Sequence, residues 1–375
     1  MKKIYLDNAA TTQVRAEVIA EMMRILADDF GNPSSSHSFG RISRNTIELS
    51  RKAIAAQLHA HAGEIIFTSG ATEANNWIIR NAVVNLKVER IITSKIEHHA
   101  VLHAVERMGQ EYGVIVDYVK ILPDGGIDMA HLESLLSQDK PTLVSLMHVN
   151  NETGVITDIE AVAKMAKLYG AYFHSDTVQS VGKLRIDVQQ FPIDFLVASA
   201  HKFHGPKGIG FAYIRKGLAI NPVFFGGEQE KGLRPGTESV HNIAGMAKAL
   251  ELSYAQLESD ESHIRSVKQY AFDQLSGRFP EMKVNGNADF TLYNILNVLL
   301  PFSPEKTSMI LFNLDMKGIA VSRGSACQSG SPKPSHVLAE MLGGSDLEKP
   351  SLRISFSHYN SQDDIDELVK ALMMI

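Results

Sequence analysis

The sequence is poor in cysteine: Cys327 is the only one in 375 residues. A lone cysteine excludes a disulfide within the chain and a zinc site built from several cysteines. Long apolar runs are also missing, so we expect no membrane segment. The first residues, MKKIYLDNAATTQ, lack the apolar stretch of a secretory signal peptide. These absences predict a cytoplasmic protein, in which a thiol stays reduced.

An excess of positive charge is absent as well. The chain has 37 Lys and Arg residues against 42 Asp and Glu residues, a formal net charge of −5. Proteins that hold nucleic acid usually carry a basic patch, so we expect no direct nucleic-acid partner. The hydrophobic content of 44% is that of a globular protein, and the length predicts two domains.

Apolar runs alternate with helical patterns in much of the chain. The runs that we interpret as strands are Ile65–Thr68, Ile91–Ser94, Thr142–Met147, Tyr172–Ser175, Phe195–Ser199 and Ile209–Ile214. Residues 43–58 and 158–170 place apolar side chains at helical spacing, and the second stretch ends on Gly170, a C-terminal signal. This alternation predicts an α/β fold with a mainly parallel sheet covered on both faces.

After about Asn221 the alternation weakens, and residues 240–279 form one long helical pattern. The stretch YNILNVLL, the segment around Cys327, the stretch SLRISFS and a terminal helix follow. We therefore expect a large α/β domain over residues 15–259. A smaller α+β domain, formed by residues 1–14 and 260–375, is expected to carry the cysteine.

The stretch IIFTSGATEANNWII predicts a strand, a tight turn and a helix, with Ser69, Gly70, Ala71 and Thr72 at the start of the helix. A helix N-terminus offers free N–H groups that bind phosphate, and small residues let the phosphate come close. A plain capped turn, with the threonine as the cap, is the simpler alternative.

Two further stretches place polar side chains after strands. In HSDTVQS, Asp176 and Gln179 lie at the sheet edge where α/β proteins bind ligands, although the aspartate could also be a cap or a metal ligand. In FLVASAHKFHGPKG, Lys202 follows a buried strand, where burial favours the neutral amine that forms a Schiff base. A lysine that reaches from a turn to solvent is the alternative.

These three features together match the needs of one cofactor, pyridoxal phosphate. A phosphate site anchors the ring, an aspartate keeps the pyridine nitrogen protonated, and a lysine holds the aldehyde. Each feature is weak alone, and the combination favours an enzyme that uses this cofactor.

The motifs of the chain also resemble those of a known family. In family order, the chain contains YLDNAATT, GNPSSSH, FTSGATEANN, EHHAVL, HVNNETGV, HSDTVQSVGK, SAHKFHGPKG, RPGTE, RGSACQSGS and LRISFS. The sequence is similar to the cysteine desulfurases of the NifS/IscS type, in the class V aminotransferase family. This resemblance covers almost the whole chain and implies fold type I of the pyridoxal-phosphate transferases, with a large-domain sheet of the seven-stranded type.

The resemblance implies a role for each motif residue. It implies that Lys202 holds the cofactor aldehyde, that Asp176 pairs with the pyridine nitrogen, that Gln179 binds the ring hydroxyl, and that His98 stacks on the ring. It implies that Ala71, Thr72, Ser199 and His201 hold the phosphate, with Thr237 reaching it from the second subunit of a homodimer. It implies that Asn151 contacts substrate and cofactor, and that Arg353 binds the substrate carboxylate with its planar guanidinium.

The resemblance also gives the lone thiol a role. Cys327 would lie on a long loop, attack the sulfur of L-cysteine, release L-alanine and keep the sulfur as a persulfide. The persulfide would pass to a sulfur-acceptor protein, either an iron–sulfur scaffold or a tRNA-thiolation enzyme. Lys202 would act as the base for the α-proton, so the expected catalytic residues are these two and His98.

Two alternatives stay open at this point. A selenocysteine or cystine lyase would use the same fold but needs no persulfide carrier, so the placement of Cys327 speaks against it. A binding module without enzymatic activity would not need Lys202, Asp176 and Cys327 together, and a yellow purified protein would exclude it.

Overall fold

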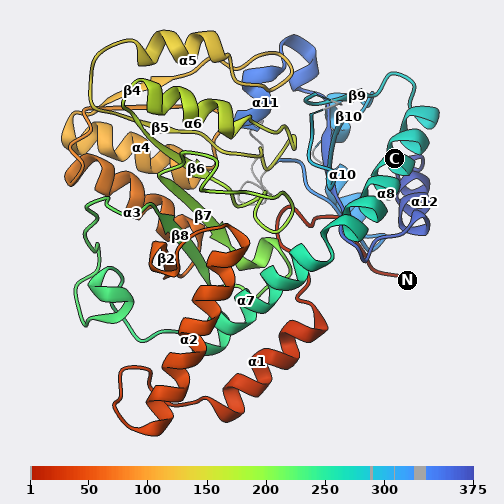
Figure 1. Ribbon diagram of the computed structural model, residues 1–375. Coiled ribbons are helices and arrows are strands. Elements are labelled where there is room, and N and C mark those ends of the chain that lie inside the picture. The colour runs from red at the N-terminus through yellow and green to blue at the C-terminus, as the bar shows by residue number, and fades with distance from the viewer. Residues whose placement is uncertain (1, 288–289, 308, 325–334) are drawn as a thin grey trace.

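The computed structural model describes residues 2–287, 290–307, 309–324 and 335–375 (Figure 1). Its seven-stranded sheet joins, in spatial order, β2 (Ile65–Thr68), β8 (Gly210–Ile214), β7 (Phe195–Ser199), β6 (Tyr172–Asp176), β5 (Thr142–Ser145), β3 (Arg90–Thr93) and β4 (Ile115–Tyr118). Only β8 runs against its neighbours in this sheet; the other pairs are parallel. The predicted α/β fold with a mainly parallel sheet is therefore confirmed. Sequence interpretation missed β4, which is only partly buried.

Helices cover both faces of this sheet, as predicted. Successive strand residues point to opposite faces, so Leu143 packs in the core under α3 and α4, whereas Val144 packs in the core of the other face. The helices are α1 (Ala16–Asp28), α2 (Ser38–Gln57), α3 (Ala71–Val84), α4 (His99–Tyr112), α5 (Met129–Leu136), α6 (Ile159–Leu168) and α7 (Val240–Ala255). The C-terminal signal after α6 is confirmed, because Gly170 has a φ of +66°.

A second, smaller body lies beside the large sheet in Figure 1. Its antiparallel sheet has the order β12 (Ser351–Ser355), β10 (Ile295–Leu299) and β9 (Lys283–Val284), and α8 (Leu257–Arg278) and α12 (Gln362–Leu372) share its core. The N-terminal strand β1 (Ile4–Tyr5) pairs in parallel with β11 (Ile319–Ala320), and Leu6 is fully buried in the same core. The first residues of the chain therefore pack with its last third.

The long helical pattern over residues 240–279 was wrong in one respect: it forms two helices. The chain leaves helical geometry at Gln256, with φ −105° and ψ 9°, and α8 begins at the next residue. The side chains of α7 pack in the large core and most buried side chains of α8 pack in the small one. The predicted domain boundary at residue 259 lies close to this break and stays a prediction.

Short elements complete the described chain. They are α9 (Pro304–Thr307), α10 (Ile310–Asp315), α11 (His336–Met341) and the 3-10 turns η1 (Ala62–Glu64), η2 (Ala200–Lys202), η3 (Gln229–Gly232) and η5 (Gly344–Leu347). Within the described ranges, no helix has the length and apolar character needed to cross a membrane. The elements that matter most for the site are η2 and the ends of β6 and β7.

Candidate active site

A cavity of about 480 Å³ lies at the carboxyl ends of β6 and β7. Of the residues predicted for the site, the cavity is lined by Ala71, Thr72, His98, Asn151, Asp176, Gln179, Ser199, His201, Lys202 and Arg353. Thr237 is exposed and does not line it, and its role toward a second subunit stays a prediction. Cys327 lies outside the described residues. The cavity volume suits a cofactor-sized ligand.

The sheet explains why these side chains meet. Strands β6 and β7 are parallel neighbours, so Asp176 and Ser199, their last residues, lie at the same edge. The chain then enters η2, which carries His201 and Lys202 into the cavity. The predicted position at the carboxyl edge of the sheet is thus observed, and it is the usual ligand-binding edge of α/β folds.

The start of α3 forms one end of the cavity. The helix begins at Ala71 after Gly70, whose φ of +154° favours glycine. Strand β8 approaches closely here, because a Cβ atom on Gly210 would lie 2.8 Å from the Gly70 Cα atom. The backbone N–H groups of this first helical turn have no partner within the helix, so they can bind an anion.

An acid beside this turn is neutralised by an arginine. Glu73 lines the cavity and accepts hydrogen bonds from the Ser69 backbone N–H at 2.8 Å and from Arg234 Nε at 2.9 Å. Burial raises the pKa of this carboxyl, but these hydrogen bonds and the charge of Arg234 outweigh burial and hold the pKa below its usual value. The paired carboxylate therefore opposes an incoming phosphate less than a free one would. Neither residue was singled out from the sequence.

His201 also faces the cavity, with its Nδ1 atom 3.1 Å from the Thr11 hydroxyl. Burial, followed by the charges of Lys202, Lys207 and Lys183, lowers the pKa of His201 to about 4. The imidazole is therefore neutral near pH 7, and one of its two nitrogens carries a proton that can be donated.

Asp176 is held by two hydrogen bonds. Its carboxylate accepts from Asn75 Nδ2 at 2.8 Å and from the Val178 backbone N–H at 3.1 Å. Asn75 is completely buried, and its Oδ1 atom has no partner among the described residues. Sequence reasoning missed Asn75, although its place one helical turn after Ala71 would have put it on the cavity side of α3.

Lys202 and Gln179 meet at one carbonyl group. Lys202 Nζ donates to the carbonyl oxygens of Ala9 at 2.7 Å and Ala10 at 2.8 Å. Gln179 Nε2 donates to the same Ala9 oxygen at 2.9 Å. The two alanines belong to the YLDNAATT motif, which had no assigned role in the sequence interpretation. Their carbonyls hold the lysine amine inside the cavity.

His98 caps α4. Its Nδ1 atom accepts a hydrogen bond from the Ala100 backbone N–H at 3.1 Å, so in the neutral ring the proton lies on Nε2. Burial is the main cause of a lowered pKa for His98; the charge of Lys202 lowers it further, while Asp176 opposes. The ring therefore lines the cavity as a neutral group at pH 7.

Arg353 enters the cavity from β12 of the small sheet and is 1% exposed. Its Nη2 atom lies 2.8 Å from a carboxylate oxygen of Asp7, and Nη1 donates to the Asn151 carbonyl at 2.8 Å. The buried Nε–H has no partner among the described residues. The guanidinium is thus fixed in place and keeps a donor for a further acceptor.

The described residues on either side of the segment that contains Cys327 meet at Glu152, the residue after the cavity residue Asn151. On one side, a Cβ atom on Gly324 would lie 3.3 Å from Glu152 Oε2. On the other side, the Ser335 hydroxyl donates to the same carboxylate oxygen. Glu152 is completely buried. The described ends of the segment therefore meet next to the cavity.

The residues present fit pyridoxal phosphate. The α3 N-terminus can hold a phosphate, and the Asp176 carboxylate and the Lys202 amine line the same cavity. The buried Gln179 Oε1 atom has no partner among the described residues and is available for a ligand hydroxyl. A buried acceptor without a partner is costly, so a group that donates to it is expected.

Comparison with known proteins agrees with this fit. Residues 4–368 match the family model "Aminotransferase class-V". The chain is 41% identical over its full length to the "Cysteine desulfurase IscS" of Dictyoglomus turgidum, covering 94% of that protein. A solved "NIFS-LIKE PROTEIN" superposes with a TM-score of 0.91 at 34% identity, with both chains covered completely. The structure "SspA in complex with cysteine" has a TM-score of 0.82 at 32% identity, covering 96% of this chain and 100% of that one.

The fold and the cavity define an enzyme of the pyridoxal-phosphate type, and the chain belongs to the class V aminotransferase family. Within that family, the full-length similarity places it with the cysteine desulfurases of the NifS/IscS type. The resemblance recognised in the sequence motifs is confirmed.

Proposed function

We propose that the protein removes sulfur from L-cysteine, releases L-alanine and carries the sulfur as a persulfide on Cys327. The observation that carries this proposal is the meeting of two sets of groups at one cavity. Lys202 and Asp176 come from the large sheet, and Arg353 comes from the small one. The ends of the segment with the thiol lie beside the same cavity.

The cofactor is pyridoxal phosphate, on which this family depends. The α3 N-terminus, with Thr72, Ser199 and His201, would hold the phosphate, and the carboxylate of Asp176 would face the pyridine nitrogen. Gln179 would bind the ring hydroxyl. When bound, the cofactor supplies an electron sink for the bonds at the substrate α-carbon.

Arg353 and Asn151 would position the substrate. The fixed guanidinium has a free Nε–H toward a carboxylate, and its contact with the Asn151 carbonyl ties the two residues together. Lys202 lines the cavity, with its amine held by the Ala9 carbonyl, and it would take the α-proton. His98 would lie against the cofactor ring as a neutral imidazole.

The thiolate of Cys327 would attack the sulfur atom of the substrate. An S–S bond forms, the C–S bond breaks, and its electron pair stays with the carbon, which takes up a proton to give L-alanine. The sulfur remains on the enzyme as the terminal –SH of the persulfide. A sulfur-acceptor protein, an iron–sulfur scaffold or a tRNA-thiolation enzyme, then receives it. A reducing compartment such as the cytoplasm keeps such a thiol available.

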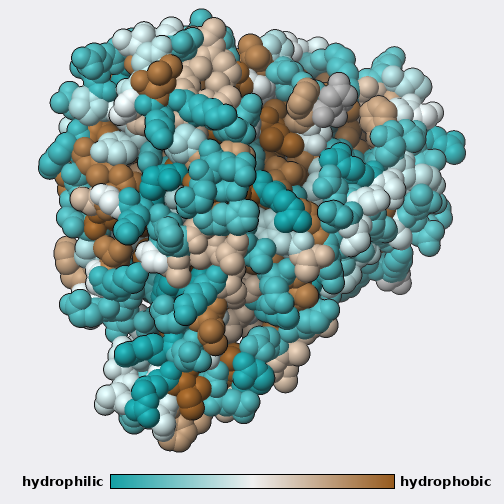
Figure 2. Space-filling view, in the orientation of Figure 1, coloured by the Kyte–Doolittle hydropathy of each residue, from teal (hydrophilic) through white to brown (hydrophobic). Residues whose placement is uncertain are grey.

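The active form would be a homodimer. Support comes from apolar side chains exposed on and near α1 and α2: Met23 and Leu26 on α1 are 65% and 56% exposed, Phe30 after α1 is 71% exposed, and Leu49 on α2 is 56% exposed. Figure 2 shows brown side chains among hydrophilic ones at the lower end of the molecule. Phe225 is 93% exposed and precedes the glycine-rich stretch that leads to Thr237. Large apolar side chains exposed together on one part of a surface are typical of a protein interface. A monomeric mass in light scattering at full activity would contradict the dimer.

The decisive experiment measures alanine and sulfide together. Purified protein with pyridoxal phosphate, L-cysteine and a thiol reductant should form both products in equal amounts. Cys327→Ser should form neither, while still binding the cofactor. If Cys327→Ser produced alanine at the wild-type rate, the persulfide step would be wrong and a lyase reaction would replace it.

A further inference from the structure

A second lysine lies directly behind the cofactor site. Lys183 belongs to the turn after β6, and only 7% of it is exposed. Its Nζ atom donates to the backbone carbonyl of Lys202 at 2.9 Å and to that of Gln179 at 3.2 Å. These are the two residues whose side chains share the carbonyl oxygen of Ala9 on the cavity side. Gln179 and Lys202 are therefore joined twice, through their side chains in front and through their carbonyls behind.

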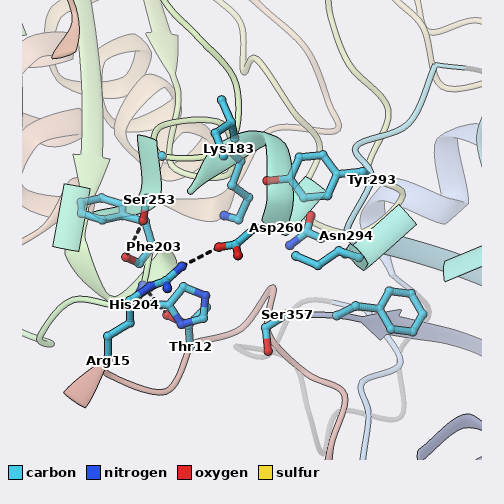
Figure 3. A pocket seen from close by; sticks show the side chains of 14 residues that line it. Thr12, Arg15, Lys183, Phe203, His204, Ser253, Asp260, Tyr293, Asn294 and Ser357 are labelled. Atoms are coloured by element: carbon cyan, nitrogen blue, oxygen red, sulfur yellow. Dashed lines mark hydrogen bonds and ion pairs between the residues drawn. The ribbon is translucent and has the colours of Figure 1, made fainter. Parts of the chain in front are cut away.

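The acid near Lys183 is already paired with another residue. Within the described ranges, no carboxylate forms an ion pair with Lys183, and Asp260, which lines the same small cavity, is bound to Arg15 at 2.5 Å (Figure 3). That cavity, of about 30 Å³, is large enough for a water molecule. The Lys183 amine is therefore held by two carbonyls and, among the described residues, by no counter-ion, so its protonated form costs free energy.

The turn itself does not depend on this side chain. The Gly182 backbone N–H donates to the Tyr254 hydroxyl at 3.3 Å, and that hydroxyl donates to the Leu184 carbonyl at 3.1 Å. Tyr254 thus fixes the backbone on both sides of Lys183. The ammonium serves the neighbouring carbonyls of Gln179 and Lys202, and we expect the turn to keep its shape without it.

We propose that Lys183 is a positioning residue for the cofactor: its ammonium holds the carbonyls of Gln179 and Lys202 together, so that both side chains stay directed into the cavity. This inference rests on the proposed function, because it concerns residues that would contact pyridoxal phosphate. The ammonium contributes by fixing geometry before the cofactor arrives, which lowers the cost of binding.

Electrostatics gives this role a measurable signature. Burial, and then the charge of Lys202, lowers the pKa of Lys183 to about 7. The two amines oppose each other's protonation, so removal of the Lys183 charge should make the nitrogen of Lys202 easier to protonate. The other charged or titratable groups around the small cavity are Arg15, His204, Asp260 and Tyr293. Burial lowers the pKa of His204 to about 3 and that of His201 to about 4, with the charge of Lys183 as a minor cause, so removal of that charge should raise both.

The test compares two lysines whose amines donate to backbone carbonyls and whose pKa values are lowered mainly by burial. Lys183→Met removes the ammonium at similar volume, and Lys268→Met is the matched control. Lys268 also has a lowered pKa, about 8, mainly from burial, and donates to the Leu292 carbonyl at 2.9 Å, but it lines neither cavity. Apo protein is titrated with pyridoxal phosphate, followed by visible absorption, and its thermal midpoint is measured separately. Wild-type binding must first be seen, since its absence would refute the proposed function itself.

We expect opposite changes in stability and binding for Lys183→Met. The apo thermal midpoint should stay the same or rise, because an unpaired buried charge is replaced by a packed apolar group. The Kd for pyridoxal phosphate should rise about tenfold or more, a loss typical of one charge-assisted hydrogen bond. The pH midpoint of the visible band should shift upward. Lys268→Met should leave both the Kd and the pH midpoint at wild-type values.

Lys183→Arg separates donation from packing, because arginine keeps its donors and its charge. It should recover most of the affinity and the wild-type pH midpoint. The inference is overturned if Lys183→Met binds within about twofold of wild type, if Lys268→Met loses as much affinity, or if folded Lys183→Arg binds as weakly as Lys183→Met. Should Lys183→Met fail to fold, Lys183→Gln takes its place under the same criteria.

Discussion

The two walls of the active-site cavity differ in how their side chains are held. On the large-domain wall, Asp176 and Ser199 end neighbouring strands of a seven-stranded sheet, and Lys202 follows directly in η2. On the other wall, Arg353 lies on a three-stranded sheet and is fixed across the cavity by Asp7 and Asn151. The position of the first set of residues is therefore set by where the strands of the large sheet end. The guanidinium of Arg353 is in addition held by contacts with segments that are distant in the sequence.

This difference indicates a division of labour. Groups carried by a rigid sheet keep their positions without a ligand, which suits the retention of a cofactor. Arg353 is fixed by contacts with two other segments of the chain and keeps a buried donor without a partner among the described residues, which suits a substrate carboxylate. Cofactor binding and turnover should therefore be separable by substitution.

The largest effect is expected from Lys202→Ala. This substitution removes the amine that Ala9 and Ala10 hold in the cavity. Turnover should fall by about 10³-fold or more, since both the cofactor attachment and the base are lost. Absorption spectra should lose the band of the lysine-bound cofactor, while gel filtration should still show folded protein. A variant with normal turnover would contradict the assignment.

Cys327→Ser should stop turnover without changing how the cofactor binds. A serine hydroxyl stays protonated near pH 7, whereas a thiol with an ordinary pKa of about 8.5 supplies some thiolate. We expect no sulfide and no persulfide, with the Kd for pyridoxal phosphate within about threefold of wild type. Ser329→Ala, in the same segment, is the control and should keep its activity. Equal loss of cofactor binding and turnover would break the proposed separation.

Arg353→Lys should act on the substrate. Lysine cannot reproduce the two contacts of the guanidinium with Asp7 and Asn151 and still direct a donor at a carboxylate. The KM for L-cysteine should rise by about 10- to 100-fold, as expected for the loss of a charge-assisted hydrogen bond, and cofactor affinity should change little. Steady-state kinetics at several cofactor concentrations distinguish a change in the KM for L-cysteine from a change in cofactor affinity. An unchanged KM with weakened cofactor binding would show that Arg353 serves the cofactor and not the substrate.

Sequence reasoning found the side chains that follow strands, because their positions depend only on local order. Asp176 and Lys202 each follow an apolar run, and parallel strands bring such ends together whatever the details of the fold. The same reasoning predicted a phosphate site at the start of α3, with a plain capped turn as the alternative. Recognition of the motifs supplied the rest, above all His98, Asn151 and Arg353, for which periodicity gave no signal.

The features that were missed depend on tertiary contacts. Ala9 and Ala10 act through carbonyl oxygens, which no side-chain pattern reveals. Asn75 and Lys183 act from behind residues that were recognised, and their partners lie far away in the sequence or across a turn. The break at Gln256 interrupts a pattern that is helical on both sides, so only the change of packing partner marks it. The reversed direction of β8 is likewise a property of the assembled sheet.

Asn75→Ala should lower the affinity for the cofactor moderately. The substitution removes a 2.8 Å hydrogen bond to Asp176, and such bonds to charged groups contribute about 1.5–3 kcal/mol. We expect the Kd for pyridoxal phosphate to rise about tenfold, with an unchanged KM for L-cysteine at saturating cofactor. Asn81→Ala is the matched control on α3, because Asn81 is equally buried but binds the carbonyls of Trp77 and Asn221. Asn81→Ala should lower stability and leave the Kd unchanged.

The smallest effect at neutral pH concerns stability, and it should appear only in acid. Burial lowers the pKa of His148, His174 and His201 to about 4 and that of His204 to about 3. Unfolding restores an ordinary pKa near 6.5, so the unfolded chain takes up protons first, and the free energy of unfolding should fall as the pH drops from about 6.5 to about 4. Glu97, whose pKa burial raises to about 8, opposes this trend as a single group.

These four histidines all lie in the large body, in or after β5, β6 and β7. Hydrogen exchange at pH 7 and pH 5, with saturating cofactor, should therefore show protection lost in the large sheet before the small one, because protonation destabilises the body that buries the imidazoles. An equal loss of protection in β6 and in β10 between pH 7 and pH 5 would show that the two bodies unfold as one unit. In that case the large sheet would depend on the small body for its stability. The two groups of residues would then differ in the ligands that they bind but not in how they unfold.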